Sequence, residues 1–256
     1  MKSNRWELHT DPAADGATNM KIDGDLLRAI ETCAEPRTVI RFYSWHRPTL
    51  SLGRNQTPRK GADLDFCNRH GIDVVHRPTG GLAVLHDDEI TYAVISNEPA
   101  AFAGGSVYGT YRRVSEALAD GYRRLGVDVA LAARSDRNLP AVDADDPCFV
   151  SQSRYELAFN GRKLVGSAQR RLRRAFLQHG SMPLSVDREL LARATGFGDP
   201  ECLEREVTAL DECVERIPSR DDLVATFVSA FADYFQVTFD RFGGGKSAVP
   251  NRGVVV

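Results

Sequence analysis

Short strand-like segments joined by brief turns constrain the fold of this chain more than any other feature of its sequence. The dipeptide Asn160-Gly161 separates two of them and is the strongest short-range signal for a β-hairpin. Several intervals are too short for a crossover helix, so we expect hairpin-linked strands. The pattern therefore predicts an α+β fold with a mixed, largely antiparallel sheet rather than a doubly wound sheet. The predicted strands cover residues 38–43, 49–52, 73–77, 83–85, 89–96, 128–131, 154–159, 162–169 and 175–184.

Apolar residues at helical spacing predict the helices that flank this sheet. From Val107 to Leu125 apolar residues recur at intervals of 4-3-4-4-3, which is typical of an amphipathic helix. Similar spacing predicts helices over 18–33 and 223–234, and a shorter one over 63–70.

The length of 256 residues fits one domain. We expect a catalytic domain over residues 1–242 and, from Gly243 onward, a flexible tail over 243–256. The 33 basic and 35 acidic residues nearly cancel, which argues against a nucleic-acid partner.

Compartment and metal content are predicted from what the sequence lacks. No apolar stretch approaches the roughly 18 residues of a membrane span, and no apolar leader segment begins the chain. The five cysteines include no C-x-x-C pair, so we expect reduced thiols and no metal site. These features predict a cytoplasmic protein without a membrane partner.

Several common catalytic signatures are missing from the sequence. It contains no G-x-S-x-G, H-E-x-x-H or G-x-G-x-x-G motif, so serine hydrolases, zinc proteases and dinucleotide enzymes lose their usual support. Residues 243–247 resemble the end of a phosphate loop. However, the required first glycine falls at Asp240, and Pro250 lies where a helix should follow.

Two segments with small residues are candidates for a ligand-binding site. In 77–81, Arg-Pro-Thr-Gly-Gly, adjacent glycines after a strand allow close backbone approach, and Arg77 supplies a positive charge. In 166–168, Gly-Ser-Ala, the small residues suit a backbone lining a narrow cleft. The alternatives are an ordinary Pro/Gly hairpin and a solvated strand.

Two single residues suggest chemistry at that site. Lysine is rare, with five lysines against 28 arginines, yet Lys163 stands within a predicted strand. Cys148 lies on a polar loop near cationic groups, a setting that lowers a thiol pKa and produces a nucleophile. A solvated lysine and an incidental buried cysteine are the alternatives.

Taken in order, these motifs resemble the lipoate/octanoate protein transferase and ligase family, which shares its fold with biotin protein ligases. The resemblance spans about residues 5 to 240, including 50–56, 77–86, 161–169 and 178–181. It implies that Lys163 contacts the acyl carbonyl or an acyl-adenylate. It also implies an acyl-binding site formed by Arg77, Thr79, Gly80, Gly81, Ala83, His86, Gly166, Ser167, Ala168, Gln169, His179 and Gly180.

Within the family, the chain is most similar to a cysteine-dependent octanoyltransferase branch. That branch has a Cys-Phe pair shortly before the lysine strand, and Cys148-Phe149 lies 15 residues before Lys163. Residues 155–157, Tyr-Glu-Leu, also look like that branch. The resemblance implies a Cys148 thioester that takes octanoyl from acyl carrier protein. It then gives octanoyl to a lysine of a lipoyl domain of a 2-oxoacid dehydrogenase or of the glycine cleavage H protein, with no cofactor.

Other activities in the family remain open at this point. One is an ATP- and Mg-dependent lipoate–protein ligase without the usual accessory domain, and another is an amidotransferase between lipoyl-type proteins. A third is a member that binds an acyl chain without turnover. The arginines at 170, 171, 173 and 174 form either a docking patch for acidic partners or a solvated hairpin.

Overall fold

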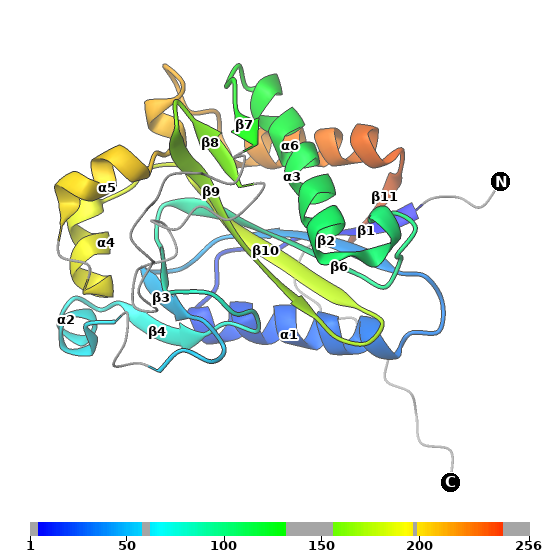
Figure 1. Ribbon diagram of the computed structural model, residues 1–256, viewed down its shortest axis with the longest axis horizontal. Helices are drawn as coiled ribbons and strands as arrows, with labels where there is room; N and C mark the ends of the chain where they lie inside the picture. Colours follow the sequence, from blue (N-terminus) through cyan, green and yellow to red (C-terminus); the bar gives the residue numbers. More distant parts are fainter. Residues whose placement is uncertain (1–4, 58–61, 132–155, 197–198, 243–256) are drawn as a thin grey trace, which may run out of the picture.

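The computed structural model describes residues 5–57, 62–131, 156–196 and 199–242 (Figure 1). The helices are α1 (Gly16–Thr32), α2 (Leu64–Arg69), α3 (Val107–Arg124), α4 (Arg188–Thr195), α5 (Pro200–Glu206) and α6 (Arg220–Phe235). The strands are β1 (Arg5–Thr10), β2 (Thr38–Tyr43), β3 (Thr49–Leu52), β4 (Asp73–His76), β5 (Val84–His86), β6 (Glu89–Ser96), β7 (Ala130–Leu131), β8 (Leu157–Phe159), β9 (Arg162–Arg171), β10 (Phe176–Pro183) and β11 (Thr238–Phe242). Two 3₁₀ turns, Ala103–Gly105 and Leu210–Glu212, complete the described elements.

The strands form two sheets. The larger has eight strands in the order β11-β1-β2-β6-β10-β9-β8-β7, and the smaller has the order β4-β3-β5. β1 is parallel to both of its neighbours, whereas the remaining pairs of the large sheet are antiparallel. In the small sheet β3 pairs parallel with β4 and antiparallel with β5. The predicted α+β class with a mixed, largely antiparallel sheet is confirmed.

Helices cover both faces of the large sheet, which is why its central strands are buried along their whole length (Figure 1). Phe42 and Val94 face the cluster built with α3 and α6. Val39 and Ile95 alternate with them and face α1 on the other side. This alternation follows from the two-residue repeat of a strand. No helix in the described part of the chain is long and apolar enough to cross a membrane.

A separate apolar cluster supports the small sheet. Leu50 and Leu52 of β3 pack with Phe66 of α2, Leu191 of α4 and Leu203 of α5. The three short helices thereby fix the small sheet beside one end of β9 and β10 (Figure 1).

The Asn160-Gly161 hairpin prediction is confirmed, whereas two other connections between consecutive strands are not hairpins. Asn160 and Gly161 both have positive φ, as a two-residue hairpin turn requires, and they join β8 to β9. In contrast, β2 and β3 belong to different sheets. The strands on either side of 77–83 lie on opposite edges of β3. The glycine segment is therefore a loop that crosses the end of β3, not a hairpin turn.

Two strands and two α-helices were not predicted. β1 and β11 come from opposite ends of the chain and pair in parallel with each other, so only a long-range contact identifies them. The helices α4 and α5 have eight and seven residues, too few for a clear apolar period. Their local signals are the N-cap residues Asp187 and Asp199, whose side chains accept backbone N–H groups.

Candidate active site

A cavity of about 370 Å³ lies between the small sheet, the strands β9 and β10 and the start of α3. Of the predicted site residues, its wall includes Arg77, Gly80, Gly81, His86, Lys163, Gly166, Ser167, Ala168, Gln169, His179 and Gly180. Thr79 lies one layer behind the wall, and Ala83 is fully buried in the small-sheet cluster. Cys148 and Phe149 lie outside the described residues.

Part of the cavity wall was not predicted from the sequence. Met20, Tyr43 and Tyr111 come from α1, β2 and α3, which no local motif connects to the glycine segment. The wall also includes Ser51, Leu82, Val84, Thr91, Val107, Glu156 and Ser181. The apolar members of this set make the interior suited to a hydrocarbon chain.

Lys163 is buried at the wall, and its Nζ lies 2.9 Å from Oε1 of Glu156. Only 2% of the lysine side chain and 3% of the glutamate side chain are exposed. The backbone of Lys163, in β9, is fixed by two neighbours. Lys163 pairs with Ala158 of β8, and its carbonyl oxygen accepts the N–H of Thr208. A charge pair this deeply buried requires both partners, since either ion alone is costly to desolvate.

Arg77 holds the glycine loop rather than reaching freely into the cavity. Its guanidinium donates to the carbonyl oxygens of Gly80 and Leu82 at 2.8 and 2.7 Å, and to the carbonyl of Ser51 at 2.8 Å. Its Nε also lies 3.2 Å from Oγ1 of Thr79. The expected positive charge is therefore present at the cavity wall, but it also braces the loop that forms this wall.

Glycine is required at two close approaches around the cavity. A Cβ on Gly53 would lie 1.9 Å from the carbonyl oxygen of Gly81, so the loop passes β3 only because that side chain is absent. A Cβ on Gly180 would lie 2.5 Å from the carbonyl oxygen of Gly166 and 2.7 Å from Tyr92. The narrowness of the cleft therefore depends on these glycines.

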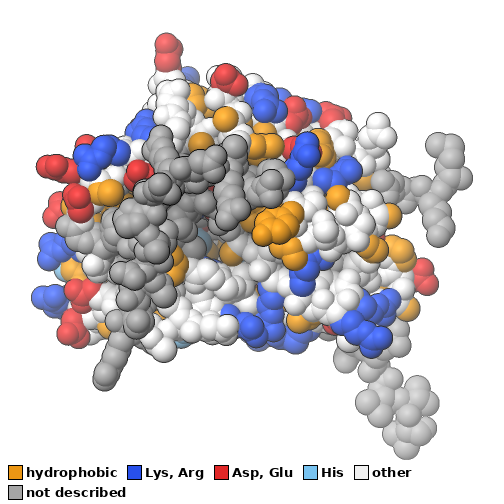
Figure 2. All heavy atoms as spheres, in the orientation of Figure 1, with side chains coloured by type: hydrophobic (Ala, Val, Ile, Leu, Met, Phe, Trp, Pro, Cys, Tyr) orange, Lys and Arg blue, Asp and Glu red, His pale blue; other side chains and the backbone are white. Residues whose placement is uncertain are grey.

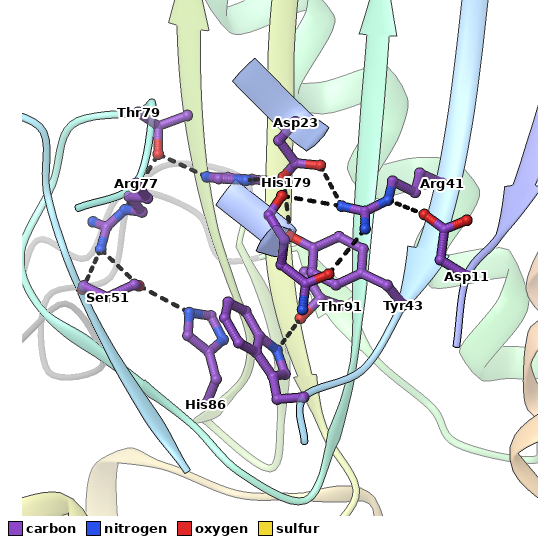
Figure 3. A network of polar contacts seen from close by, with 12 residues as sticks. Asp11, Asp23, Arg41, Tyr43, Ser51, Arg77, Thr79, His86, Thr91 and His179 are labelled. Atoms are coloured by element: carbon purple, nitrogen blue, oxygen red, sulfur yellow. Dashed lines mark hydrogen bonds and ion pairs between the residues drawn. The ribbon is translucent and has the colours of Figure 1, made fainter. Parts of the chain in front are cut away.

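His179 is embedded in a buried polar network (Figure 3). Its Nδ1 lies 2.8 Å from Oδ2 of Asp23, and its Nε2 lies 2.8 Å from Oγ1 of Thr79. Asp23 in turn accepts from Arg41 at 2.8 Å and from Tyr43 at 2.9 Å. Burial lowers the pKa of His179, and this effect outweighs the opposing influence of Asp23. His179 is therefore neutral at physiological pH.

His86 has a matching set of partners. Its Nε2 lies 2.8 Å from Oγ of Ser51, and its Nδ1 lies 2.9 Å from Oε1 of Glu89. Glu89 is buried and also accepts from Trp45, Thr91 and Ser181. Burial alone would raise the pKa of Glu89, but His86 and the hydroxyl donors outweigh it and lower that pKa.

The strand β9 presents one edge to the cavity. β8 pairs with β9 only up to Val165, so from Gly166 onward that edge has no strand partner among the residues described. Ser167 is fixed there by Tyr92, whose hydroxyl lies 2.8 Å from its Oγ, and by Tyr111, which donates to its carbonyl at 3.2 Å. The backbone of 166–168 therefore borders the cavity in a fixed conformation.

Asp23, Arg41 and Glu89 were not among the predicted site residues, although they organise the site from behind. Asp23 lies within the helix predicted over 18–33, but its partner His179 is 156 residues away. Within the described residues, no group of three or more His, Cys, Asp or Glu side chains is arranged to hold a metal ion.

Comparison with known proteins identifies a single family. Residues 15–232 match the family model described as the lipoyl protein ligase A/B catalytic domain. Octanoyltransferase LipM of an Exiguobacterium species is 36% identical over 249 residues, covering 94% of this chain and 90% of that protein. Octanoyltransferase LipM of Carboxydothermus hydrogenoformans is also 36% identical, over 245 residues, covering 92% and 88%.

Solved structures show the same fold. A bipartite lipoate protein ligase from Thermoplasma acidophilum superposes with a TM-score of 0.74 at 20% identity, covering 94% of this chain and 88% of that chain. Lipoate-protein ligase A bound with ATP gives a TM-score of 0.73 at 22% identity, covering 96% and 90%. At these identities the likeness concerns the fold alone.

Proposed function

The chain belongs to the lipoyl protein ligase A/B catalytic domain family, and from this premise we propose that it is an octanoyltransferase of protein lipoylation. It transfers an octanoyl group to a lysine of a lipoyl-domain protein. The observation that carries the proposal is the buried Lys163–Glu156 pair on the wall of a largely apolar cavity. The octanoyltransferase relatives, 33–39% identical, favour a transferase over an ATP-dependent ligase.

The cavity provides the place for the acyl chain. Its volume of about 370 Å³ lies within the range of small-ligand sites. Each methylene of the chain that leaves water contributes about 0.8 kcal/mol of binding free energy. The wall residues Met20, Leu82 and Val107 receive the chain between the glycine loop and β9.

Lys163 acts on the acyl carbonyl. Its ammonium group is held at the wall by Glu156, so a positive hydrogen-bond donor is already oriented before the acyl group arrives. During acyl transfer the carbonyl oxygen becomes negative, and a preorganised cation stabilises this charge more than it stabilises the neutral carbonyl. Lys163 thereby accelerates both transfer steps.

Cys148 is proposed as the nucleophile on the strength of its sequence context, because it lies outside the described residues. Its thiolate attacks the carbonyl of an octanoyl thioester on acyl carrier protein. A new carbon–sulfur bond to Cys148 forms and the bond to the carrier sulfur breaks, so the carrier leaves as a thiolate and takes up the proton that the Cys148 thiol lost on ionising. Because the step needs a free thiol, we place the reaction in the cytoplasm.

In the second step the lysine amine of the lipoyl domain attacks the Cys148 thioester. An amide bond forms, the carbon–sulfur bond breaks, and the amine proton returns to the Cys148 sulfur. The acceptor domain belongs to a 2-oxoacid dehydrogenase or to the glycine cleavage H protein. Thioester exchange is nearly balanced in free energy and amide formation from a thioester is downhill, so the proposed reaction uses neither ATP nor a metal.

The test is to incubate the protein with octanoyl carrier protein and apo lipoyl domain without ATP and to record intact masses. We expect an octanoyl adduct on the enzyme and on the lipoyl domain. Cys148→Ala should abolish both, whereas the matched control Cys202→Ala, at a half-buried cysteine of α5, should change neither. Transfer that occurs only with ATP and free octanoate or lipoate would overturn the proposal in favour of a ligase.

A further inference from the structure

We propose that Asp23 and Glu89 are positioning residues, each of which orients one histidine so that two relays hold the acyl-binding glycine loop through Arg77. The inference rests on the proposed function, because the loop matters only if an acyl chain binds beside it. It concerns how the cavity is kept ready for substrate. Figure 3 shows Arg77 between Thr79, which contacts His179, and Ser51, which contacts His86.

The first relay runs from Asp23 through His179 to Thr79. A carboxylate only accepts hydrogen bonds, so Nδ1 of His179 carries the proton that it shares with Asp23 over 2.8 Å. Nε2 of the neutral ring is then an acceptor, and the Thr79 hydroxyl donates to it over 2.8 Å. With its proton committed, the Thr79 oxygen accepts from Nε of Arg77 at 3.2 Å.

The second relay has the same chemistry with different residues. Glu89 accepts from Nδ1 of His86 at 2.9 Å, and Nε2 of His86 lies 2.8 Å from Oγ of Ser51. The Ser51 oxygen accepts from Nη1 of Arg77 at 3.3 Å. Both relays therefore connect the Arg77 guanidinium, through a hydroxyl and a histidine, to a buried carboxylate.

Arg77 is where the relays meet the loop. Two of its nitrogens contact the relay hydroxyls, and Nη2 donates to the carbonyl oxygens of Gly80 and Leu82. The guanidinium is planar and rigid, so fixing it at two points also fixes the direction of its donors to the loop. Gly81 has a φ of 92°, and the loop has no regular strand or helix structure that would fix its shape.

The Ser51–His86–Glu89 connectivity is also that of a hydrolytic triad, but the surroundings of Ser51 argue for a brace. Ser51 has 0% of its surface exposed. Its oxygen already accepts from Arg77, which is itself buried and bonded to the loop. A nucleophilic hydroxyl must be accessible to the substrate carbonyl, whereas a hydroxyl that supports the loop must be enclosed and hydrogen-bonded.

The first experiment cuts each relay at its hydroxyl and measures steady-state octanoyl transfer from octanoyl carrier protein to apo lipoyl domain. Thr79→Val and Ser51→Ala should each raise KM for the octanoyl donor about tenfold with little change in kcat, because a loosened loop weakens binding uniformly. Thr79→Ser keeps the hydroxyl and should restore KM. The matched control Thr226→Val, whose hydroxyl bonds only to its own helix, should leave KM unchanged.

The relays should also be coupled, because both act on the same guanidinium. In the double variant Ser51→Ala/Thr79→Val, we expect the fold increase in KM over the wild-type value to differ from the product of the two single fold increases. The difference should exceed about twofold. A simple product would mean that the two hydroxyls act independently and would overturn the idea of convergence on Arg77.

The carboxylates are tested with a pair of variants on the same arginine. Asp23→Asn leaves one side-chain oxygen, which can accept from Arg41 or from His179 but does not replace both carboxylate oxygens. The variant should therefore raise KM. Asp11→Asn removes the negative charge from a contact to Arg41 at 2.5 Å but leaves the relay intact, and should not raise KM. Glu89→Gln should act like Asp23→Asn. Melting temperatures identify any variant that fails to fold.

The possible failures are distinguishable. If the wild-type protein transfers octanoyl and every relay variant keeps its KM, the inference is wrong and the proposed function stands. Equal loss of kcat in all relay variants, without rescue by Thr79→Ser, would also overturn it. If the wild-type protein does not transfer octanoyl at all, the proposed function is at fault.

Discussion

Lys163 and Glu156 show how one buried pair combines chemistry with stability. Both side chains are almost fully enclosed, and the Nζ–Oε1 distance is 2.9 Å. Removing two charges from water costs several kcal/mol for each ion, and mutual attraction offsets this only in good geometry. A residue with an entirely structural role at this position would be better served by an apolar side chain. Retention of the pair is expected if the ammonium acts on substrate.

We therefore expect two separable effects from changes at this pair. Lys163→Met should reduce octanoyl transfer by about 10²–10³-fold. It should also lower the free energy of unfolding by about 3–5 kcal/mol, because the charge of Glu156 is no longer compensated. The double variant Lys163→Met/Glu156→Leu should regain most of the stability but none of the transfer. Urea unfolding and transfer rates check this, and recovery of activity in the double variant would exclude a chemical role for Lys163.

At the scale of elements, the pairing of β1 with β11 and β2 is the part of the fold most dependent on distant contacts. β1 joins the two ends of the described chain, and Trp6 packs against Phe102 and Phe235 beneath it. The ion pair between Glu7 and Arg37 secures β1 beside β2, with two bonds of 2.6 and 2.8 Å. Burial disfavours ionisation of Glu7, but Arg37 outweighs this and lowers the pKa of Glu7 to about 2.

This pKa predicts a specific loss of stability in acid. Ionised Glu7 is favoured in the folded state, so its contribution is complete above its ordinary pKa of 4.5 and is lost as pH falls towards about 2. Glu7→Gln should lower the free energy of unfolding at neutral pH and remove part of the decline in acid. Urea unfolding at several pH values measures this. If the free energy of unfolding of the variant falls with pH as steeply as that of the wild-type protein, Glu7 does not stabilise β1.

At the scale of the whole molecule, the arginines near the site divide into two groups. Arg170 and Arg171 bond to Pro78 and Ser106, so they brace the cavity surroundings. Arg173 and Arg174 are exposed at the turn between β9 and β10. Figure 2 shows Lys and Arg side chains gathered over this turn and the adjoining part of α1. This surface is suited to an acidic protein partner.

Charge reversal at this turn tests partner docking. Arg173→Glu/Arg174→Glu should slow octanoyl transfer several-fold at low salt, and the difference from the wild-type protein should shrink as salt screens the interaction. Arg69→Glu/Arg205→Glu makes the same charge change at exposed positions on α2 and α5 and is the matched control. Equal rates and equal salt dependence in the two double variants would show that the turn does not dock the partner.

Strand and helix content came largely from local pattern. β2, β3 and β6 follow the predicted bounds because short segments rich in apolar and β-branched residues are a local signal. The Asn160-Gly161 hairpin was equally local, because its two positive φ angles require those residue types. The assignment of Cys148 as nucleophile, the tail over 243–256 and the absence of a cofactor stay predictions.

Local sequence patterns predicted most of the strands, the longer helices, the family motifs and the position of Lys163 beside small residues. Long-range contacts establish which strands pair, that the glycine loop crosses β3, and that Glu156, Asp23 and Glu89 support the site. The difference arises from the sequence separation of the interacting residues. Turn chemistry and apolar period act within a few residues, whereas Asp23 meets His179 across 156 positions. Such a contact exists only after the chain has folded, when burial makes each polar group depend on a partner.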